Sequence, residues 1–320
     1  MKKIVYKWLS ILLPILLGVF LTLYSYNQFT DDQLLEIKSY FKNANYNIVF
    51  LAIIIAFIGN AARAYRWKYM LNHLGYNSTF ANNFMAVNIG YLLNIAIPKS
   101  GEVSRALIVK KYNNIPFDKG FGTIIAERII DMIVLLFIML IAFLMQFQII
   151  KQFILDKISL QNLIIFSSIG IIGLITFFSI YKYSKLKIVS LFKEKISGLK
   201  EGLLSIVHMK TKWEYFFYTI IIWGSYIIMF YTAIFVIPET SHLTIGAVII
   251  SFVVGSIAIA FTNSGFGSYP FLISKVLIFY SVAETAGNAF GWIIWTSQMF
   301  LVLFLGLLSF LLLPIINKSK

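Results

Sequence analysis

Cysteine is absent from this sequence, and charged residues are scarce. Without cysteine, neither a disulfide framework nor a thiolate metal site can form. Charged residues make up 12% of the chain and hydrophobic residues 59%, and the mean hydropathy is +0.84, which excludes a soluble domain and indicates a polytopic membrane protein. The three histidines, His73, His208 and His242, are far apart and form no ligand pair. We therefore expect no metal and no cofactor.

Acidic residues are also few, at 13 against 27 lysines and arginines, which gives a net charge of +14. Such a charge can indicate nucleic-acid binding, but here the lysines lie in short loops beside apolar runs. That placement is typical of membrane orientation and of attraction to anionic lipid head groups, so no nucleic-acid partner is expected. The predicted outer loops contain only four basic residues, Lys38, Lys42, Lys151 and Lys157. This bias predicts that both termini are cytoplasmic.

A broken apolar segment at residues 79–98 organises the first half of the chain. It breaks at Pro98 and continues as a charged helix from Glu102, with Ser100 predicted as the helix cap and Gly101 as the turn. Both flanks are basic, so we expect a re-entrant hairpin that enters from the cytoplasm and returns to it. An ordinary cytoplasmic loop is the alternative. The basic and aromatic run 63–68 before it is interpreted as an interfacial anchor.

Ionisable residues follow at positions where the chain is otherwise apolar. Glu102 and Arg105 lie three residues apart on one helix face, and Glu127, Arg128 and Asp131 lie near the start of the next span. Charges at membrane depth are costly and often mark function. The alternative is a self-neutralised structural cluster in which Arg128 pairs with Asp131.

A second broken segment organises the other half. Residues 244–261 are apolar, the break is at residues 262–270, and a helix then runs through Lys275 without a basic flank, so this hairpin should enter from outside. The two halves, 1–181 and 213–320, then contain the same parts in inverted topology, as in transporters. The basic segment 182–212 joins them, either as an amphipathic helix on the inner leaflet or as a plain connector. The predicted fold is all-α, with about six full spans and two re-entrant hairpins.

The two breaks are the predicted substrate site. Helix N-termini, glycines and cationic side chains suit a lipid phosphate, and the acidic residues suit an amine or balance the cations. The candidate substrate-binding residues are Lys99, Ser100, Gly101, Glu102, Arg105, Glu127, Arg128, Asp131, Asn263, Ser264, Gly265, Gly267, Ser268 and Tyr269. No nucleophile–base constellation is evident, so no catalytic residue is assigned.

Three segments carry a resemblance to a known family: 98–105 (PKSGEVSR), 127–131 (ERIID) and 263–270 (NSGFGSYP). Over nearly its whole length the chain resembles the flippase-like transmembrane family of lysylphosphatidylglycerol synthase. Where that family commonly has Pro-Gly-Gly followed by an acidic residue, this chain has Tyr269 and Pro270. The resemblance implies a stand-alone translocating module without the aminoacyl-transferase domain.

The hydropathy predicts a multi-pass membrane protein, and the resemblance implies that it lies in a prokaryotic cytoplasmic membrane and moves a lipid with a charged or glycosylated head group. The expected partner is an anionic phospholipid or a polyprenyl-phosphate-type lipid, and a homo-oligomer is compatible with these features. Two other functions stay open. One is a membrane-embedded transferase that acts on a lipid phosphate, and the other is a protein that presents lipid to a separate enzyme.

Overall fold

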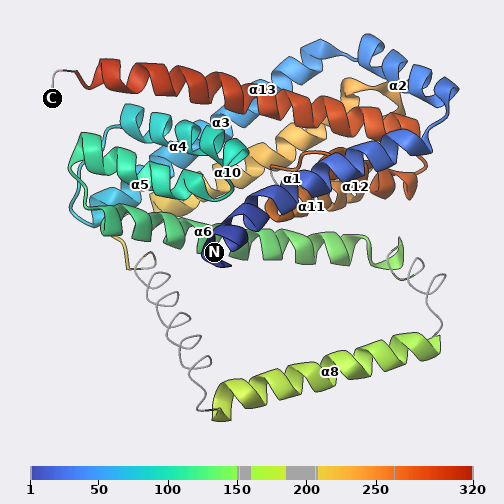
Figure 1. The fold of residues 1–320 in the computed structure, drawn as a ribbon, viewed down its shortest axis with the longest axis horizontal. Helices are drawn as coiled ribbons and strands as arrows, with labels where there is room; N and C mark the ends of the chain where they lie inside the picture. The colour runs from blue at the N-terminus through green and yellow to red at the C-terminus, as the bar shows by residue number, and fades with distance from the viewer. Residues whose placement is uncertain are drawn as a thin grey trace. The chain divides into compact units, whose positions relative to one another are not determined.

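The computed structural model describes residues 2–149, 151, 160–184, 206, 208–262 and 264–318. Regular structure in these residues is entirely helical, and they contain no strand, so the predicted all-α class is confirmed for them (Figure 1). The elements are α1 (Lys2–Gln28), α2 (Asp31–Asn43), α3 (Tyr46–His73), α4 (Phe80–Ala96), α5 (Ser100–Asn113), α6 (Phe117–Met145), α8 (Leu160–Tyr183), α10 (Lys212–Ala233), η1 (Ile234–Val236), η2 (Pro238–Thr240), α11 (Ile245–Phe261), α12 (Ser268–Ile278) and α13 (Glu284–Ile316).

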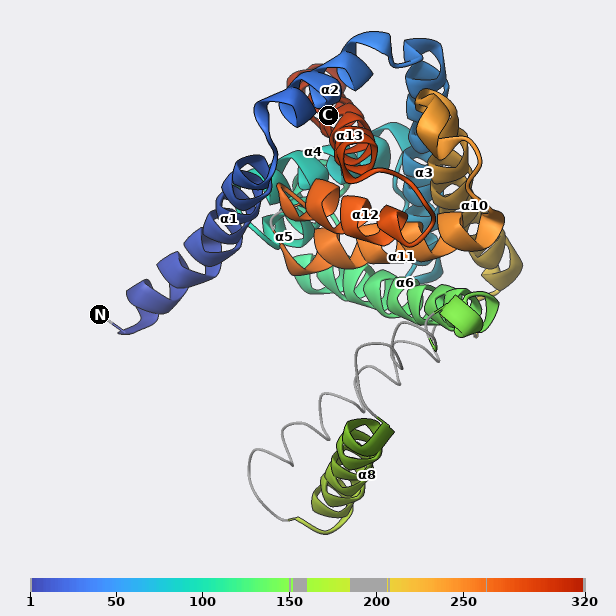
Figure 2. The same ribbon diagram turned by 90° about the vertical axis from the view of Figure 1, so that its right-hand side faces the viewer.

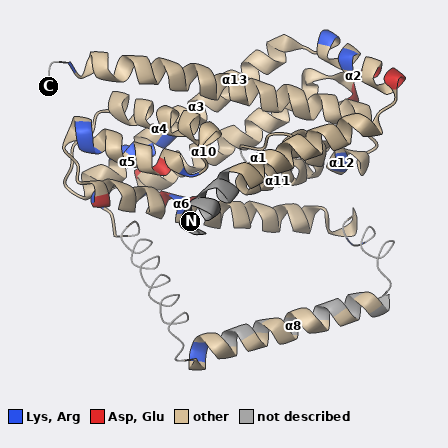
Figure 3. Ribbon diagram, in the orientation of Figure 1, with Lys and Arg blue, Asp and Glu red and all other residues tan. Residues whose placement is uncertain are grey.

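Four of the described helices are long and apolar enough to cross a bilayer: α3, α6, α10 together with η1, and α13. They contain 25 to 33 residues, and a hydrocarbon core of about 30 Å needs about 20. The longest, α13, carries no charged residue after Glu284 (Figure 3). A helix pair bent by 115°, α1 with α2, makes a fifth span if it is counted as one. The chain is a multi-pass membrane protein, while the count of six spans and the cytoplasmic termini stay predictions.

The helices form two compact units. Unit 1 comprises Met1–Ile124 and Lys210–Lys320, and unit 2 comprises Ile125–Met209. Both broken hairpins, α4–α5 and α11–α12, belong to unit 1. The predicted halves, 1–181 and 213–320, are defined by a repeated order of segments along the chain and not by compactness. The two compact units therefore do not test them, and the halves stay a prediction. Most of the basic segment 182–212 lies outside the described residues.

One order of helix lengths occurs twice along the chain. A long helix, two short ones and a second long helix follow one another in α3–α4–α5–α6 and again in α10–α11–α12–α13. The first short helix has 17 residues in both series. It begins in both at a threonine, Thr79 or Thr244, whose hydroxyl accepts the backbone N–H three residues on, at 3.2 and 3.3 Å. It ends in both at an extended residue, Ile97 or Thr262. This repetition supports the predicted relation between the halves.

Within unit 1, α3 packs along α10, and α13 packs against α2, α3, α4 and α12. Aromatic rings join these helices: the centroid of Tyr65 in α3 lies 4.2 Å from that of Phe80 and 5.4 Å from that of Tyr218 in α10. Within the described part of unit 1, α1 packs mainly against α12, and its N-terminal end extends away from the other helices of this unit (Figure 2).

Three asparagines tie one end of the first hairpin to α13. Asn82 and Asn317 exchange reciprocal amide hydrogen bonds of 3.1 and 2.9 Å, and the Nδ2 of Asn82 also donates to the Oδ1 of Asn113 at 3.1 Å. Asn82 is almost fully buried. The start of α4, the last residue of α5 and the end of α13 are thereby held together.

We expect the Asn82–Asn317 pair to contribute measurably to stability. A double-mutant cycle with Asn82→Ala and Asn317→Ala should give a coupling of about 0.6–1.7 kcal/mol, the range for side-chain hydrogen bonds between membrane helices. Thermal unfolding in detergent measures it. Asn77→Ala, at an exposed position, is the control and should change stability by less than about 0.5 kcal/mol. Strict additivity of the two substitutions would show that the amide pair does not join the helices.

Candidate functional site

The first break differs in detail from the sequence prediction. The turn is made by Lys99, which has φ 65° and ψ 8°, and α5 begins at Ser100. Ser100 does not cap α5, so that prediction is wrong. Its hydroxyl instead donates to the carbonyls of Leu93 and Ile97, at 3.0 and 2.7 Å. Leu93 lies in the last turn of α4, and Ile97 is the residue that follows this helix. The hydroxyl of Ser100 therefore binds the C-terminal end of α4, where carbonyls lack a full set of helical partners, and does not cap α5.

Gly101 allows α4 and α5 to approach each other, and it does not make the turn. Its backbone N–H donates to the Oδ1 of Asn94 at 2.7 Å. A Cβ on Gly101 would lie 2.3 Å from the carbonyl oxygen of Gly90, an atom of the α4 backbone. The two arms of the first hairpin therefore touch backbone to backbone at this point.

The second break is built from left-handed residues. Ser264, Gly265 and Gly267 have φ values of 56°, 79° and 66°, and α12 begins at Ser268, inside the predicted break 262–270. The Nε1 of Trp295 in α13 donates to the carbonyl of Ser264 at 2.8 Å. Asn263, which the sequence assigned to the site, lies outside the described residues.

The tip of the second hairpin rests on α1. A Cβ on Gly267 would lie 2.1 Å from the carbonyl oxygen of Gly18, so the two backbones are in direct contact. Ser268 is buried, and its hydroxyl lies 2.8 Å from that of Thr262 across the break. Tyr269 is buried with its ring against Gly255 of α11, and it thus packs between the two arms of its own hairpin.

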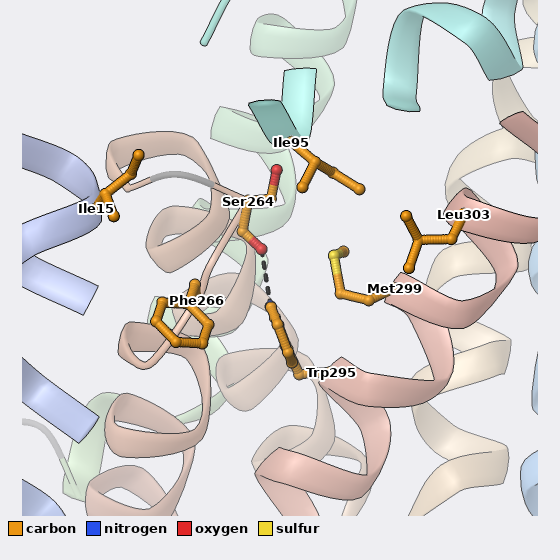
Figure 4. Close-up of a pocket in the computed structure, with 7 residues that line it drawn as sticks. All are labelled: Ile15, Ile95, Ser264, Phe266, Trp295, Met299 and Leu303. Atoms are coloured by element: carbon orange, nitrogen blue, oxygen red, sulfur yellow. Dashed lines mark hydrogen bonds between the residues drawn. The ribbon is translucent and has the colours of Figure 1, made fainter. Parts of the chain in front are cut away.

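The two hairpin tips share one cavity of about 230 Å³ (Figure 4). Ile95, in the last turn of α4, contributes from the first hairpin, and Ser264 and Phe266 contribute from the second. The remaining lining residues are Ile15 of α1 and Trp295, Met299 and Leu303 of α13. Ser264 is the only one of the candidate residues among those described that lines it. The lining is almost wholly apolar, whereas the sequence predicts a charged head group at the two breaks.

Arg105 lies buried against α3 in unit 1. Its guanidinium carbon is 4.2 Å from the ring centroid of Trp67, and the Nε1 of Trp67 donates to the hydroxyl of Thr123 at 2.8 Å. This arrangement links α5 to α3 and the start of α6. Glu102 is half-buried one turn earlier in α5, and Lys99 is exposed.

Two further buried arginines were missed by the sequence analysis. The run 63–68 was interpreted as an interfacial anchor, but Arg66 and Trp67 are fully buried and Arg63 nearly so, and that interpretation is wrong. Arg66 donates to the hydroxyl of Thr219 at 3.3 Å and lies over the ring of Tyr215 at 5.3 Å, both in α10. In the sequence, residues 59, 63, 66, 67 and 70 fall on one helix face, but that spacing alone does not show that α3 buries this face.

In unit 2, the charged cluster of α6 contains two buried carboxylates. Glu127 is fully buried, Asp131 is nearly so, and Arg128 is half-buried. Burial of carboxylates in an apolar helix is costly and marks these residues as functional candidates. The pairing of Arg128 with Asp131 stays a prediction. Among the described residues, no group of three acidic or histidine side chains is arranged to hold a metal ion.

Comparisons with known proteins agree with the resemblance seen in the sequence. A family model described as the lysylphosphatidylglycerol synthase TM region matches residues 9–306. The UPF0104 membrane protein MJ1595 of Methanocaldococcus jannaschii is 34% identical over 98 residues, which are 30% of this chain and 29% of that protein. The UPF0104 membrane protein PH1989 of Pyrococcus horikoshii is 33% identical over 105 residues, 32% of this chain and 31% of that protein.

A third relative, glycosyltransferase AglD of Haloferax volcanii, is 29% identical over 99 residues, which are 31% of this chain and 16% of that protein. Each of these alignments spans less than a third of the relative's own length. No solved structure matches the chain.

Proposed function

We propose a lipid-translocating function for this chain, which belongs to the family of the lysylphosphatidylglycerol synthase transmembrane region. The lipid is a phospholipid or lipid phosphate with a charged or glycosylated head group, and the membrane is the cytoplasmic membrane. The observation that carries this proposal is the meeting of two broken helices, one from each half of the sequence, at a single cavity. Broken helices that meet at mid-membrane from two inverted halves are the usual construction of secondary transporters.

The buried cations of unit 1 support an anionic substrate. Arg63, Arg66 and Arg105 are buried there, whereas no acidic residue among the described part of unit 1 is buried to the same degree. Guanidinium groups bind phosphate in a planar, bidentate fashion. Lys99 and Arg105 remain the proposed phosphate ligands of the first hairpin, with Glu102 beside them to balance charge or to bind an amine.

Head-group binding is also proposed for the charged cluster of α6 in unit 2, which consists of Glu127, Arg128 and Asp131. Two buried carboxylates on one helix face suit a cationic head group, which needs acceptors, and they can also accept hydrogen bonds from the hydroxyls of a sugar. This property distinguishes the cluster from the arginines of unit 1.

A membrane-embedded transferase is the second candidate, and the similarity to glycosyltransferase AglD favours it. The third is a protein that presents lipid to a separate enzyme. All three candidates bind lipid, and they differ in whether the lipid changes side or changes chemically.

Reconstitution separates these candidates. Proteoliposomes containing phosphatidylglycerol with a fluorescent acyl chain are treated with an impermeant reductant that destroys only outer-leaflet fluorescence. The lipids are then analysed by mass spectrometry. We expect fluorescence loss beyond that of protein-free liposomes, with no new lipid product. A new lipid product without movement would indicate the transferase. The absence of both movement and a new product would indicate a protein that presents lipid to a separate enzyme.

A further inference from the structure

The cavity at the hairpin tips offers a ligand almost only hydrocarbon and aromatic surface. Its strongest donor, the Nε1–H of Trp295, is already used by the carbonyl of Ser264 at 2.8 Å, as the dashed line in Figure 4 marks. Among the described lining residues, the Ser264 hydroxyl is then the one polar side-chain group that stays available. A phosphate or ammonium group placed there would lose its hydration without adequate compensation. The chemistry of the cavity therefore selects an apolar ligand.

The cavity lies halfway along the longest helix. Met299 is about 23 Å from the Glu284 end of α13 and about 26 Å from the Ile316 end, at a rise of 1.5 Å per residue. A helix that spans a hydrocarbon core of about 30 Å places such a residue near the bilayer centre. Hydrocarbon chains from both leaflets end at that depth.

The wall of the cavity reaches the surface of the helices. Leu303, which lines it, is 43% exposed, and Ile15 on the opposite wall is half-buried. A chain can therefore enter from the side, between α1 and α13. The backbone contact between Gly18 and Gly267 fixes α1 beside this entrance.

We propose that this cavity binds the end of a hydrocarbon chain of the lipid. The inference rests on the proposed function, since it assigns the cavity to the tail of the same translocated lipid. Because chain ends of both leaflets reach the bilayer centre, the bound tail can stay in place while the head group changes side. The tail then touches both hairpins, through Ile95 of the first and Phe266 of the second.

Photocrosslinking in proteoliposomes tests this inference. Three probes are compared: phosphatidylglycerol with a diazirine at the end of one acyl chain, the same lipid with the diazirine in its head group, and a free fatty acid with a terminal diazirine. We expect the tail-labelled lipid to modify the lining residues, with mass-spectrometric identification of the peptides. Labelling of the lining by the head-group probe, or by the free fatty acid alone, would overturn the proposal.

Cavity-filling variants give the matched control. Met299→Trp should lower tail labelling of the lining at least fivefold, whereas Phe300→Trp, at a neighbouring position of α13 that is 62% exposed, should leave it unchanged. If Met299→Trp fails to fold, Ile15→Trp replaces it, with Leu16→Trp, 60% exposed, as its control. Equal labelling in the filled and control variants would contradict the proposal.

Labelling of the cavity lining does not require transport, so the translocating function and the tail site can each be contradicted without the other. Labelling of the lining in a protein that moves no lipid would overturn only the translocating function. Lipid movement without labelling of the lining would overturn only the tail site.

Discussion

Gly267→Ala lowers the free energy of unfolding by about 2–5 kcal/mol, because two costs fall on the same residue. Gly267 has φ 66°, where an L-residue costs about 1–2 kcal/mol. The added Cβ would also lie 2.1 Å from the carbonyl oxygen of Gly18, and relief of such overpacking costs about 1–3 kcal/mol. Thermal unfolding in detergent measures the change.

The matched control for this variant is Gly122→Ala. Gly122 lies in α6, and no atom comes within 4 Å of the position of its Cβ. Removing a glycine from a helix interior should leave stability unchanged or raise it by about 0.5–1 kcal/mol. If Gly267→Ala behaves like Gly122→Ala, then α1 is not docked on the tip of the second hairpin.

Arg105 and Trp67 should be coupled by about 2 kcal/mol in a double-mutant cycle built from Arg105→Met and Trp67→Leu. The guanidinium carbon lies 4.2 Å from the ring centroid, both residues are buried, and desolvated cation–π contacts reach this strength. Lys111 above the ring of Tyr112, at 5.0 Å and with Lys111 exposed, provides the control pair. Its coupling should be about 0.5–1 kcal/mol. Equal couplings for the two pairs would contradict a buried stack.

Transport assays on Arg105 separate substrate contact from structural support. We expect Arg105→Ala to lose lipid movement, and the added change Glu102→Ala to leave it lost, since the phosphate ligand is still missing. Recovery of movement in the double variant would show instead that Arg105 only neutralises Glu102.

The hairpin breaks could be predicted from the sequence because their causes are local. Pro98 has no backbone N–H, and Gly265 and Gly267 adopt positive φ values without strain, so the helices break there whatever surrounds them. Family membership could be predicted for the same reason, since its motifs include these breaks. The start of α12 at Ser268 also follows from the last of these glycines.

The buried arginines could not be read from local sequence alone. Arg66 is buried because two residues of α10, about 150 positions further along the chain, compensate for its lost hydration. Thr219 accepts a hydrogen bond from its guanidinium group, and the ring of Tyr215 makes a cation–π contact with it. A basic run next to an apolar span otherwise indicates an interface. The prediction that Ser100 caps α5 is wrong for a related reason. Its hydroxyl can serve the helix before it or the helix after it, and the left-handed backbone of Lys99 decides which.

The inverted orientation of the two hairpins is the central claim, and single-cysteine labelling tests it most directly because the chain has no native cysteine. Lys111, exposed at the end of α5, and Ser241, exposed before α11, are each replaced by cysteine in membrane vesicles of known orientation. Each variant is treated with an impermeant maleimide. The predicted result is labelling of Lys111→Cys only from the cytoplasmic side and of Ser241→Cys only from the opposite side. Labelling of both from the same side would contradict the inverted arrangement.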